Sequence, residues 1–193
     1  VRAAAGKLPT LSQCPAQPSR FGRLFLRLLV LEHARPPPHE DSHNRRGYRW
    51  RMFGASLRFA GAFARTPALR TGLARVRFTD LEGSFGPLPP AGEAMLLRFF
   101  RVKLQSLHFC GRAFHDLPLI EGFRSLAMLY PTILWLAHWH AHSHQRVAPS
   151  EADVAAAIAM VDHHHGYSPY LPWRIRLLSQ RNDITRLCAW RGR

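Results

Sequence analysis

Apolar residues recur at helical spacing in several stretches of the chain, and no stretch shows the apolar–polar alternation of a half-buried strand. The first helical stretch, Arg20–Ala34, ends just before three consecutive prolines, which cannot continue a helix. The later helices are expected in Glu93–Cys110, Leu117–His142, Ser150–Gly166 and Pro172–Leu187. The pattern therefore predicts an all-α fold, an irregular helical bundle with a flexible basic leader at its N-terminus.

The remaining segments are predicted from turn residues and broken periodicity. Asp41–Gly54 has the composition of a polar, basic connector, and Gly83–Gly92 that of a linker. Leu57–Arg77 has apolar residues at helical spacing, but Pro67 interrupts the pattern, so two short helices are expected there. The resulting division is a flexible leader at 1–19, short helices and connectors at 20–92, and a helical bundle at 93–193.

Two of the predicted helices have recognisable end signals. Ser150 is a favoured N-cap, and Asp153 follows three residues later, at the position where a capping box has its acidic or amide side chain. Gly111 follows Glu93–Cys110 and is the expected C-cap of that helix.

The segment Leu117–His142 is apolar on nearly all sides, which is typical of a buried central helix or of a membrane span. Glu121, Arg124 and His138 would be costly inside hydrocarbon, and Pro131 interrupts the segment. A buried central helix is therefore the better interpretation, and we expect no membrane span.

The 193-residue chain has a formal net charge of +15, which favours a polyanionic partner such as nucleic acid, an anionic membrane surface or an acidic protein. Only Lys7 and Lys103 among its 27 basic residues are lysines. Because a GC-rich genome also produces arginine in place of lysine, we assign about half of this signal to codon usage and the rest to attraction for polyanions.

Three widely spaced cysteines, Cys14, Cys110 and Cys188, form no CxxC pair. A zinc ribbon or a disulfide framework is therefore not expected, and a reducing, cytoplasmic location is the default. The chain begins with Val1 in place of Met, which would suit a fragment or an alternative start codon.

The run "RRGYRWRMF", Arg45–Phe53, interleaves arginine with aromatic residues. Arginine binds phosphates and aromatic rings stack on bases, so Arg45, Arg46, Arg49 and Trp50 are candidate nucleic-acid ligands. The alternative is a solvated basic loop whose aromatic rings insert into the domain.

The histidines are candidate ligands for a transition metal. His138 and His142 are four residues apart and share one face of a helix. The helical phase places His165 on the core side of the next helix and Asp162 on the flank of that side. A site across the two helices would use His138, His142, Asp162 and His165. One alternative is that these histidines satisfy carbonyls near helix C-termini. Another is a catalytic or pH-linked role. A HExxH motif, a glycine-rich phosphate loop and a GxSxG motif are absent from the sequence.

Leu96–Pro169 resembles the C-terminal helical part of bacterial cysteine-cluster proteins related to flagellin lysine N-methylase. The resemblance is carried by "LLRFFRVKLQSLHFCGRAF", "LIEGFRSLAMLYPTILWLA" and "SEADVAAAIAMVDHHHGYSP", and within them by Arg98, Glu121, Gly122, Asp162, His164, Gly166 and Ser168. It implies an accessory helical domain of a methylase-like protein with a protein substrate. The cysteine cluster that defines the family is absent, so methyl transfer by this chain alone is not expected. A nucleic-acid-binding module and a small histidine-based metal-binding protein are the alternatives.

Overall fold

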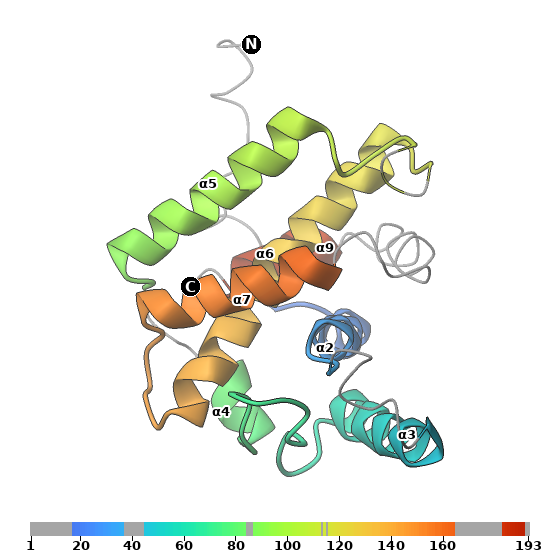
Figure 1. Ribbon diagram of the computed structural model, residues 1–193, viewed down its shortest axis with the longest axis vertical. Helices are drawn as coiled ribbons and strands as arrows, with labels where there is room; N and C mark the ends of the chain where they lie inside the picture. Colours follow the sequence, from blue (N-terminus) through green and yellow to red (C-terminus); the bar gives the residue numbers. More distant parts are fainter. Residues whose placement is uncertain are drawn as a thin grey trace.

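The computed structural model describes residues 17–36, 45–83, 87–112, 114, 116–164 and 183–191, and these form α-helices joined by loops (Figure 1). The helices are α2 (Arg20–His33), α3 (Arg45–Gly61), α4 (Phe78–Glu82), α5 (Pro90–Ser106), α6 (Leu119–Ser143), α7 (Glu151–His164) and α9 (Asp183–Arg191). Within these ranges no strand forms, and only two isolated β-bridges occur. The all-α prediction is confirmed.

Helix α6 is the centre of the structure, and α2, α4, α7 and α9 all contact it. Every residue from Pro131 to Ala141 is buried, which confirms the prediction of a buried central helix. None of the described helices combines the length and the apolar character that a membrane crossing requires.

An aromatic cluster joins α3 and α4 to α6. Phe59 of α3 meets Phe78 of α4 edge-on, with ring centroids 5.1 Å apart. It also contacts Trp135 and Trp139 of α6, at centroid distances of 5.9 Å and 5.7 Å. All four rings are almost fully buried. Such contacts contribute beyond the area that they bury, so the cluster fixes the position of α3 on the core.

The N-terminal ends of α2 and α7 are capped by side chains. The Gly22 amide donates to Ser19 Oγ at 2.9 Å, so a residue assigned to the leader caps α2. At α7, Ser150 and Asp153 form the predicted cap: the Ser150 amide donates to Asp153 Oδ2 at 2.7 Å, and the Asp153 amide reaches Ser150 Oγ at 3.4 Å. The predicted starts of both helices are confirmed.

Two predictions for the first half of the chain are wrong. Asp41–Gly54 is not a connector from Arg45 onward, because Arg45–Gly54 forms most of α3. Leu57–Arg77 does not form two helices: its first residues end α3, and 62–77 is a loop in which Arg65 and Arg77 pair in an antiparallel bridge. Buried Leu69 and Leu73 belong to this loop, so their helical spacing reflects core contacts without a helix.

The bounds of α5 and its cap also differ from prediction. The helix begins at Pro90, inside the expected linker, because proline is well suited to a first helical position. It ends at Ser106, and Leu107 adopts the left-handed conformation with φ 52°. Gly111 is therefore not the C-cap; with φ +64° it lies in a turn that pairs with Leu117.

The predicted helix Pro172–Leu187 is helical from Asp183 onward. Its earlier part, 172–182, lies outside the described residues, as do residues 1–16 of the leader.

Candidate nucleic-acid interface on helix α3

Helix α3 is anchored by one narrow face. Met52, Ala55 and Phe59 are buried, and Tyr48 is half-buried on the same side one turn earlier. These positions follow one another at spacings of three or four residues, as required for one face of a helix. The opposite face is therefore directed to solvent along the whole helix.

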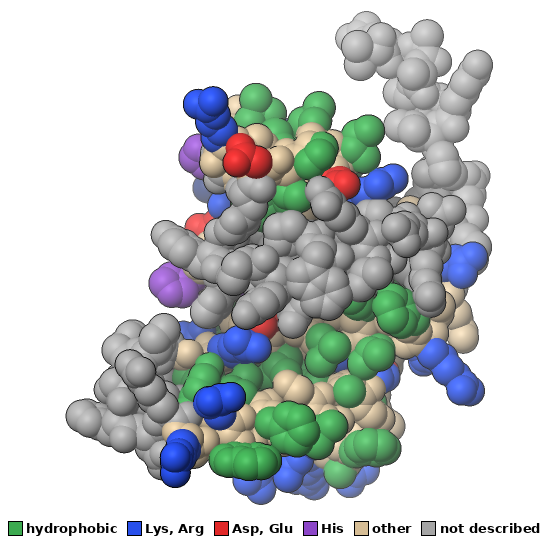
Figure 2. All heavy atoms as spheres, turned by 90° about the vertical axis from the view of Figure 1, so that its right-hand side faces the viewer, with side chains coloured by type: hydrophobic (Ala, Val, Ile, Leu, Met, Phe, Trp, Pro, Cys, Tyr) green, Lys and Arg blue, Asp and Glu red, His purple; other side chains and the backbone are tan. Residues whose placement is uncertain are grey.

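The solvent face of α3 presents large apolar side chains together with arginines. Trp50 is 74% exposed, Phe53 57% and Leu57 55%. The rings of Trp50 and Phe53 touch edge-on, with centroids 6.1 Å apart. Figure 2 shows hydrophobic side chains beside basic ones in the lower part of that view, where α3 lies. Contiguous exposed apolar patches are typical of interaction sites.

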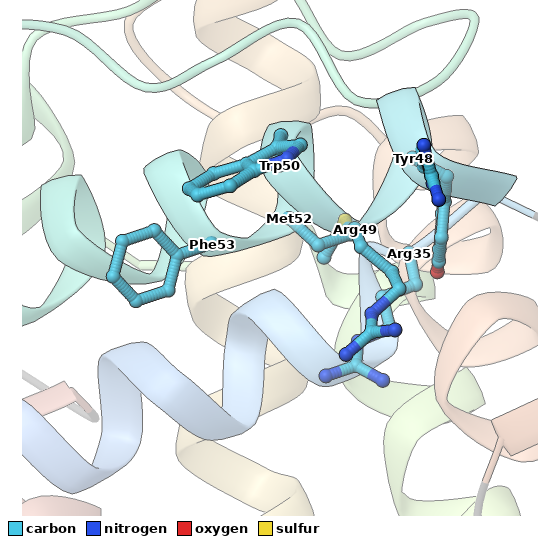
Figure 3. Close-up of a pocket in the computed structure, with 7 residues that line it drawn as sticks. Arg35, Tyr48, Arg49, Trp50, Met52 and Phe53 are labelled. Carbon is cyan, nitrogen blue, oxygen red and sulfur yellow. The ribbon is translucent and has the colours of Figure 1, made fainter. Parts of the chain in front are cut away.

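A groove of about 700 Å³ opens along the first half of α3 and the end of α2. We call it the α3 groove; it is lined by Arg35, Arg46, Tyr48, Arg49, Trp50, Met52 and Phe53. In the view of Figure 3, the side chains of Arg35 and Arg49 extend in the same direction, and Trp50 and Phe53 lie further along the helix. The groove thus combines cationic donors with exposed aromatic rings.

The described lining of this groove has an excess of positive charge, and α3 itself contains five arginines and no acidic residue. Arg35 forms an ion pair with Glu32, with Nη2 and Oε2 2.9 Å apart. Its Nε is enclosed and has no hydrogen-bond acceptor among the described residues. Arg51 packs over the Tyr48 ring at 5.8 Å on the other side of the helix. Arg49 is exposed and therefore offers donors to an anion, whereas Arg35 adds positive charge that Glu32 partly offsets.

The structure brings three of the predicted nucleic-acid residues together in the α3 groove: Arg46, Arg49 and Trp50. Arg45 begins α3, and its side chain lies outside the described part. The alternative of a loop with inserted aromatic rings is wrong for the conformation and for two of the rings, because the segment is helical and both Trp50 and Phe53 are exposed, whereas Tyr48 packs against the core. Sequence reasoning missed Arg35, because it precedes the three prolines that separate it from α3 and no pattern connects it to that helix.

The predicted metal ligands lie in different surroundings in the structure. His138 is buried in α6, and His142 is half-buried one turn later. Asp162 of α7 is 53% exposed at its side chain and forms an ion pair with Lys103 of α5, with Nζ and Oδ1 2.6 Å apart. His165 lies outside the described residues. The described ranges contain no group of three residues suited to hold a metal ion.

His140 is the histidine that connects α6 to α7. Its Nε2 lies 3.3 Å from Met160 Sδ in the core. Burial lowers the pKa of His140, although the Asp153 carboxylate acts in the opposite direction. This ring is therefore a neutral packing group and not part of the predicted metal set.

Comparison with known proteins yielded no matching family model, no matching curated protein and no matching solved structure. The resemblance to methylase-related proteins therefore stays a prediction from the sequence.

Proposed function

We propose that this chain binds single-stranded nucleic acid in the α3 groove. The observation that carries the proposal is the shared placement of exposed Trp50 and Phe53 with the guanidinium groups of Arg46 and Arg49, and with Arg35, which follows the end of α2. The net charge of +15 supports a polyanionic ligand as well.

Each component of the groove matches one part of a single strand. Guanidinium groups bind phosphate oxygens with two parallel hydrogen bonds, and Arg35, Arg46 and Arg49 all line the same groove. Unpaired bases stack on exposed aromatic rings, which contributes about 1–3 kcal/mol per base. In a duplex the base faces are already stacked, so Trp50 and Phe53 favour a single strand.

An anionic bilayer is the competing occupant, because Leu57 and Phe63 extend the exposed apolar surface beyond Phe53. Nucleic acid is favoured because the arginines line the groove itself, next to the aromatic rings. A helix that lies in a bilayer surface instead keeps its cations away from its apolar face.

The test is fluorescence anisotropy of a labelled oligothymidine at several salt concentrations. Replacing Arg46 and Arg49 by Gln should weaken binding and reduce the dependence of log K on log salt by about 0.7 per lost contact. Trp50→Ala should weaken binding roughly 5- to 150-fold at every salt concentration, since stacking contributes about 1–3 kcal/mol. It should leave the salt dependence unchanged.

The matched control replaces Arg98 and Arg101 on α5 by Gln, which removes the same charge from a different surface. Affinity that falls equally in both double variants would show diffuse attraction and would contradict the proposal. Binding to phosphatidylserine vesicles, lost in Trp50→Ala and accompanied by no oligonucleotide binding, would assign the surface to membranes instead.

A second proposal follows from the resemblance to methylase-related cysteine-cluster proteins: the chain is an accessory helical region of such a protein. It is supported by the arrangement of the resembling segments, which include α5, α6 and α7 and pack together through α7. The test is the reading frame upstream of Val1. An in-frame cysteine cluster would support this proposal, and a complete frame without one would contradict it.

A further inference from the structure

The loop between α3 and α4 is held rigidly against the C-terminal half of α6. The Thr66 amide donates to the Val76 carbonyl at 2.7 Å. The Thr66 hydroxyl donates to the Ala74 carbonyl at 3.2 Å and accepts from the Val76 amide at 3.0 Å. From α6, Trp139 Nε1 donates to the same Ala74 carbonyl at 2.8 Å. Ser143 Oγ accepts from the Ala74 amide at 2.9 Å. The backbone of this loop is therefore fixed at both of its ends.

Three arginines project from this fixed backbone. Arg65 and Arg77 pair across the antiparallel bridge, and Arg75 lies between residues that the hydrogen bonds hold in place. All three side chains are exposed. Within the described part of the chain, none of the three forms an ion pair.

The three arginines surround a hollow of about 440 Å³, which we call the arginine pocket. It is lined by Arg65, Arg75, Val76, Arg77, Asp80 and His142. Asp80 is the one carboxylate in this set, against three guanidinium groups, and its Oδ1 accepts from Thr79 Oγ1 at 3.2 Å. The pocket therefore has an excess of positive charge and an almost entirely polar lining.

We propose that the arginine pocket binds a phosphate group with two negative charges. Three guanidinium groups line one hollow on a backbone that is already fixed, so an anion there relieves the repulsion between like charges, and only the arginine side chains have to be ordered on binding. Planar guanidinium groups match phosphate oxygens in pairs. The phosphate belongs either to a small phosphate ester or to the end of a nucleic-acid strand. The residues of this pocket differ from those of the α3 groove, so the inference does not depend on the proposed function.

Titration calorimetry with sodium pyrophosphate and with inorganic phosphate tests the proposal. The protein carries Arg46→Gln and Arg49→Gln, so that the α3 groove does not contribute to the signal. Adding Arg65→Gln, Arg75→Gln and Arg77→Gln should weaken binding at least tenfold. Asp80→Asn should tighten binding, because it removes the competing carboxylate and keeps the acceptor for Thr79.

The matched control adds Arg98→Gln, Arg101→Gln and Arg124→Gln, which removes the same charge from α5 and the first half of α6. These residues do not line the arginine pocket. Affinity should stay within twofold of the parent. If the triple pocket variant does not fold by circular dichroism, the three single substitutions replace it, and each should weaken binding.

Two further ligands distinguish the sources of the phosphate. A single strand with a 5′-phosphate that binds more tightly than the same strand without it, through the arginine pocket, would identify the strand end. Equal affinity for the two strands, with pyrophosphate still bound, would identify a small phosphate ester. Absence of binding by any of these ligands, or equal weakening in the pocket and control variants, would overturn the proposal.

Discussion

Arg27 in α2 and Glu82 at the end of α4 form a bidentate ion pair that is largely enclosed by the protein. Arg27 Nε and Nη2 donate to the two carboxylate oxygens of Glu82, with Nη2 and Oε2 2.8 Å apart. The two side chains are only 13% and 15% exposed. Arg27 Nη1 also reaches the Ala60 carbonyl at the end of α3, at 3.5 Å. The pair thus connects three helices, including the one that carries the α3 groove.

Arg27→Ala should lower the free energy of unfolding by about 3–5 kcal/mol, because it leaves the Glu82 carboxylate enclosed without a partner. Urea denaturation measures this loss as a lower midpoint at an unchanged slope.

The double variant Arg27→Met and Glu82→Leu should recover most of the stability, since it removes both charges and keeps apolar volume. Arg101→Ala on the exposed face of α5 is the control, with an expected effect within about 0.5 kcal/mol. If Arg27→Ala costs less than about 1 kcal/mol, the pair behaves as a surface ion pair and the argument for its enclosure is wrong.

Asp153 at the start of α7 accepts hydrogen bonds from Arg146 and from Ser150. Arg146 Nη1 and Nη2 lie 2.6 Å and 2.9 Å from its carboxylate oxygens, and the Ser150 hydroxyl and amide each donate at 2.7 Å. Burial by itself would raise the pKa of Asp153, but these hydrogen bonds to the charged form outweigh it and lower the pKa from 3.8.

The pKa of Asp153 is lower in the folded than in the unfolded state, so the carboxylate stabilises the fold above the unfolded pKa of 3.8. That stability is lost as the pH falls through the folded pKa. Asp153→Asn should therefore be less stable near neutral pH and should lose less stability on acidification. Urea midpoints measured from about pH 6 to about pH 2.5 test this. A variant with the same acid slope as the parent would contradict the assignment.

Helix α7 could be predicted from the sequence and α3 could not, for a physical reason. The start of α7 depends on Ser150 and Asp153, which are neighbours in sequence, so its signal is local. In α3 the buried face is narrow, and Trp50 and Phe53 put apolar character on the solvent face. The usual segregation of apolar and polar faces is therefore absent from the pattern, and contacts with other helices decide the conformation.

The candidate site shows the same distinction. Arg46, Arg49 and Trp50 could be identified because they lie in one short run, whereas Arg35 joins them through the packing of α2 against α3. The arginine pocket gave no local signal either, since it combines a loop, α4 and His142 from α6. Proximity of this kind is created by the fold and has no period or motif in the sequence.

The thiol of Cys188 in α9 should be nearly unreactive in the folded protein. Its Sγ lies 3.6 Å from the Ala127 carbonyl of α6, and burial raises its pKa to about 12. The thiolate is the nucleophile, and at pH 8 only about one such thiol in 10,000 is ionised. In a Cys14→Ser variant, iodoacetamide should modify Cys110 at least about a hundredfold faster than Cys188, as followed by peptide mass spectrometry.

Unfolding in urea provides the control for the cysteine experiment, because both thiols are then exposed and should react at similar rates. Equal rates in the folded protein would mean that α9 leaves α6 readily, which would contradict the packing of Cys188 against Ala127.

Thr66 should control the rigidity of the loop that carries the arginine pocket. Thr66→Val keeps the shape of this fully buried side chain but removes the hydroxyl that serves Ala74 and Val76, at a cost of about 1–3 kcal/mol. Limited trypsin digestion should then cleave after Arg70 and Arg75 faster than in the parent, as measured by mass spectrometry, because the loop opens locally.

Thr66→Ser retains the hydroxyl and should be cleaved at these two sites at close to the parental rate. Unchanged cleavage in Thr66→Val would show that the contacts from Trp139 and Ser143 suffice to hold the loop.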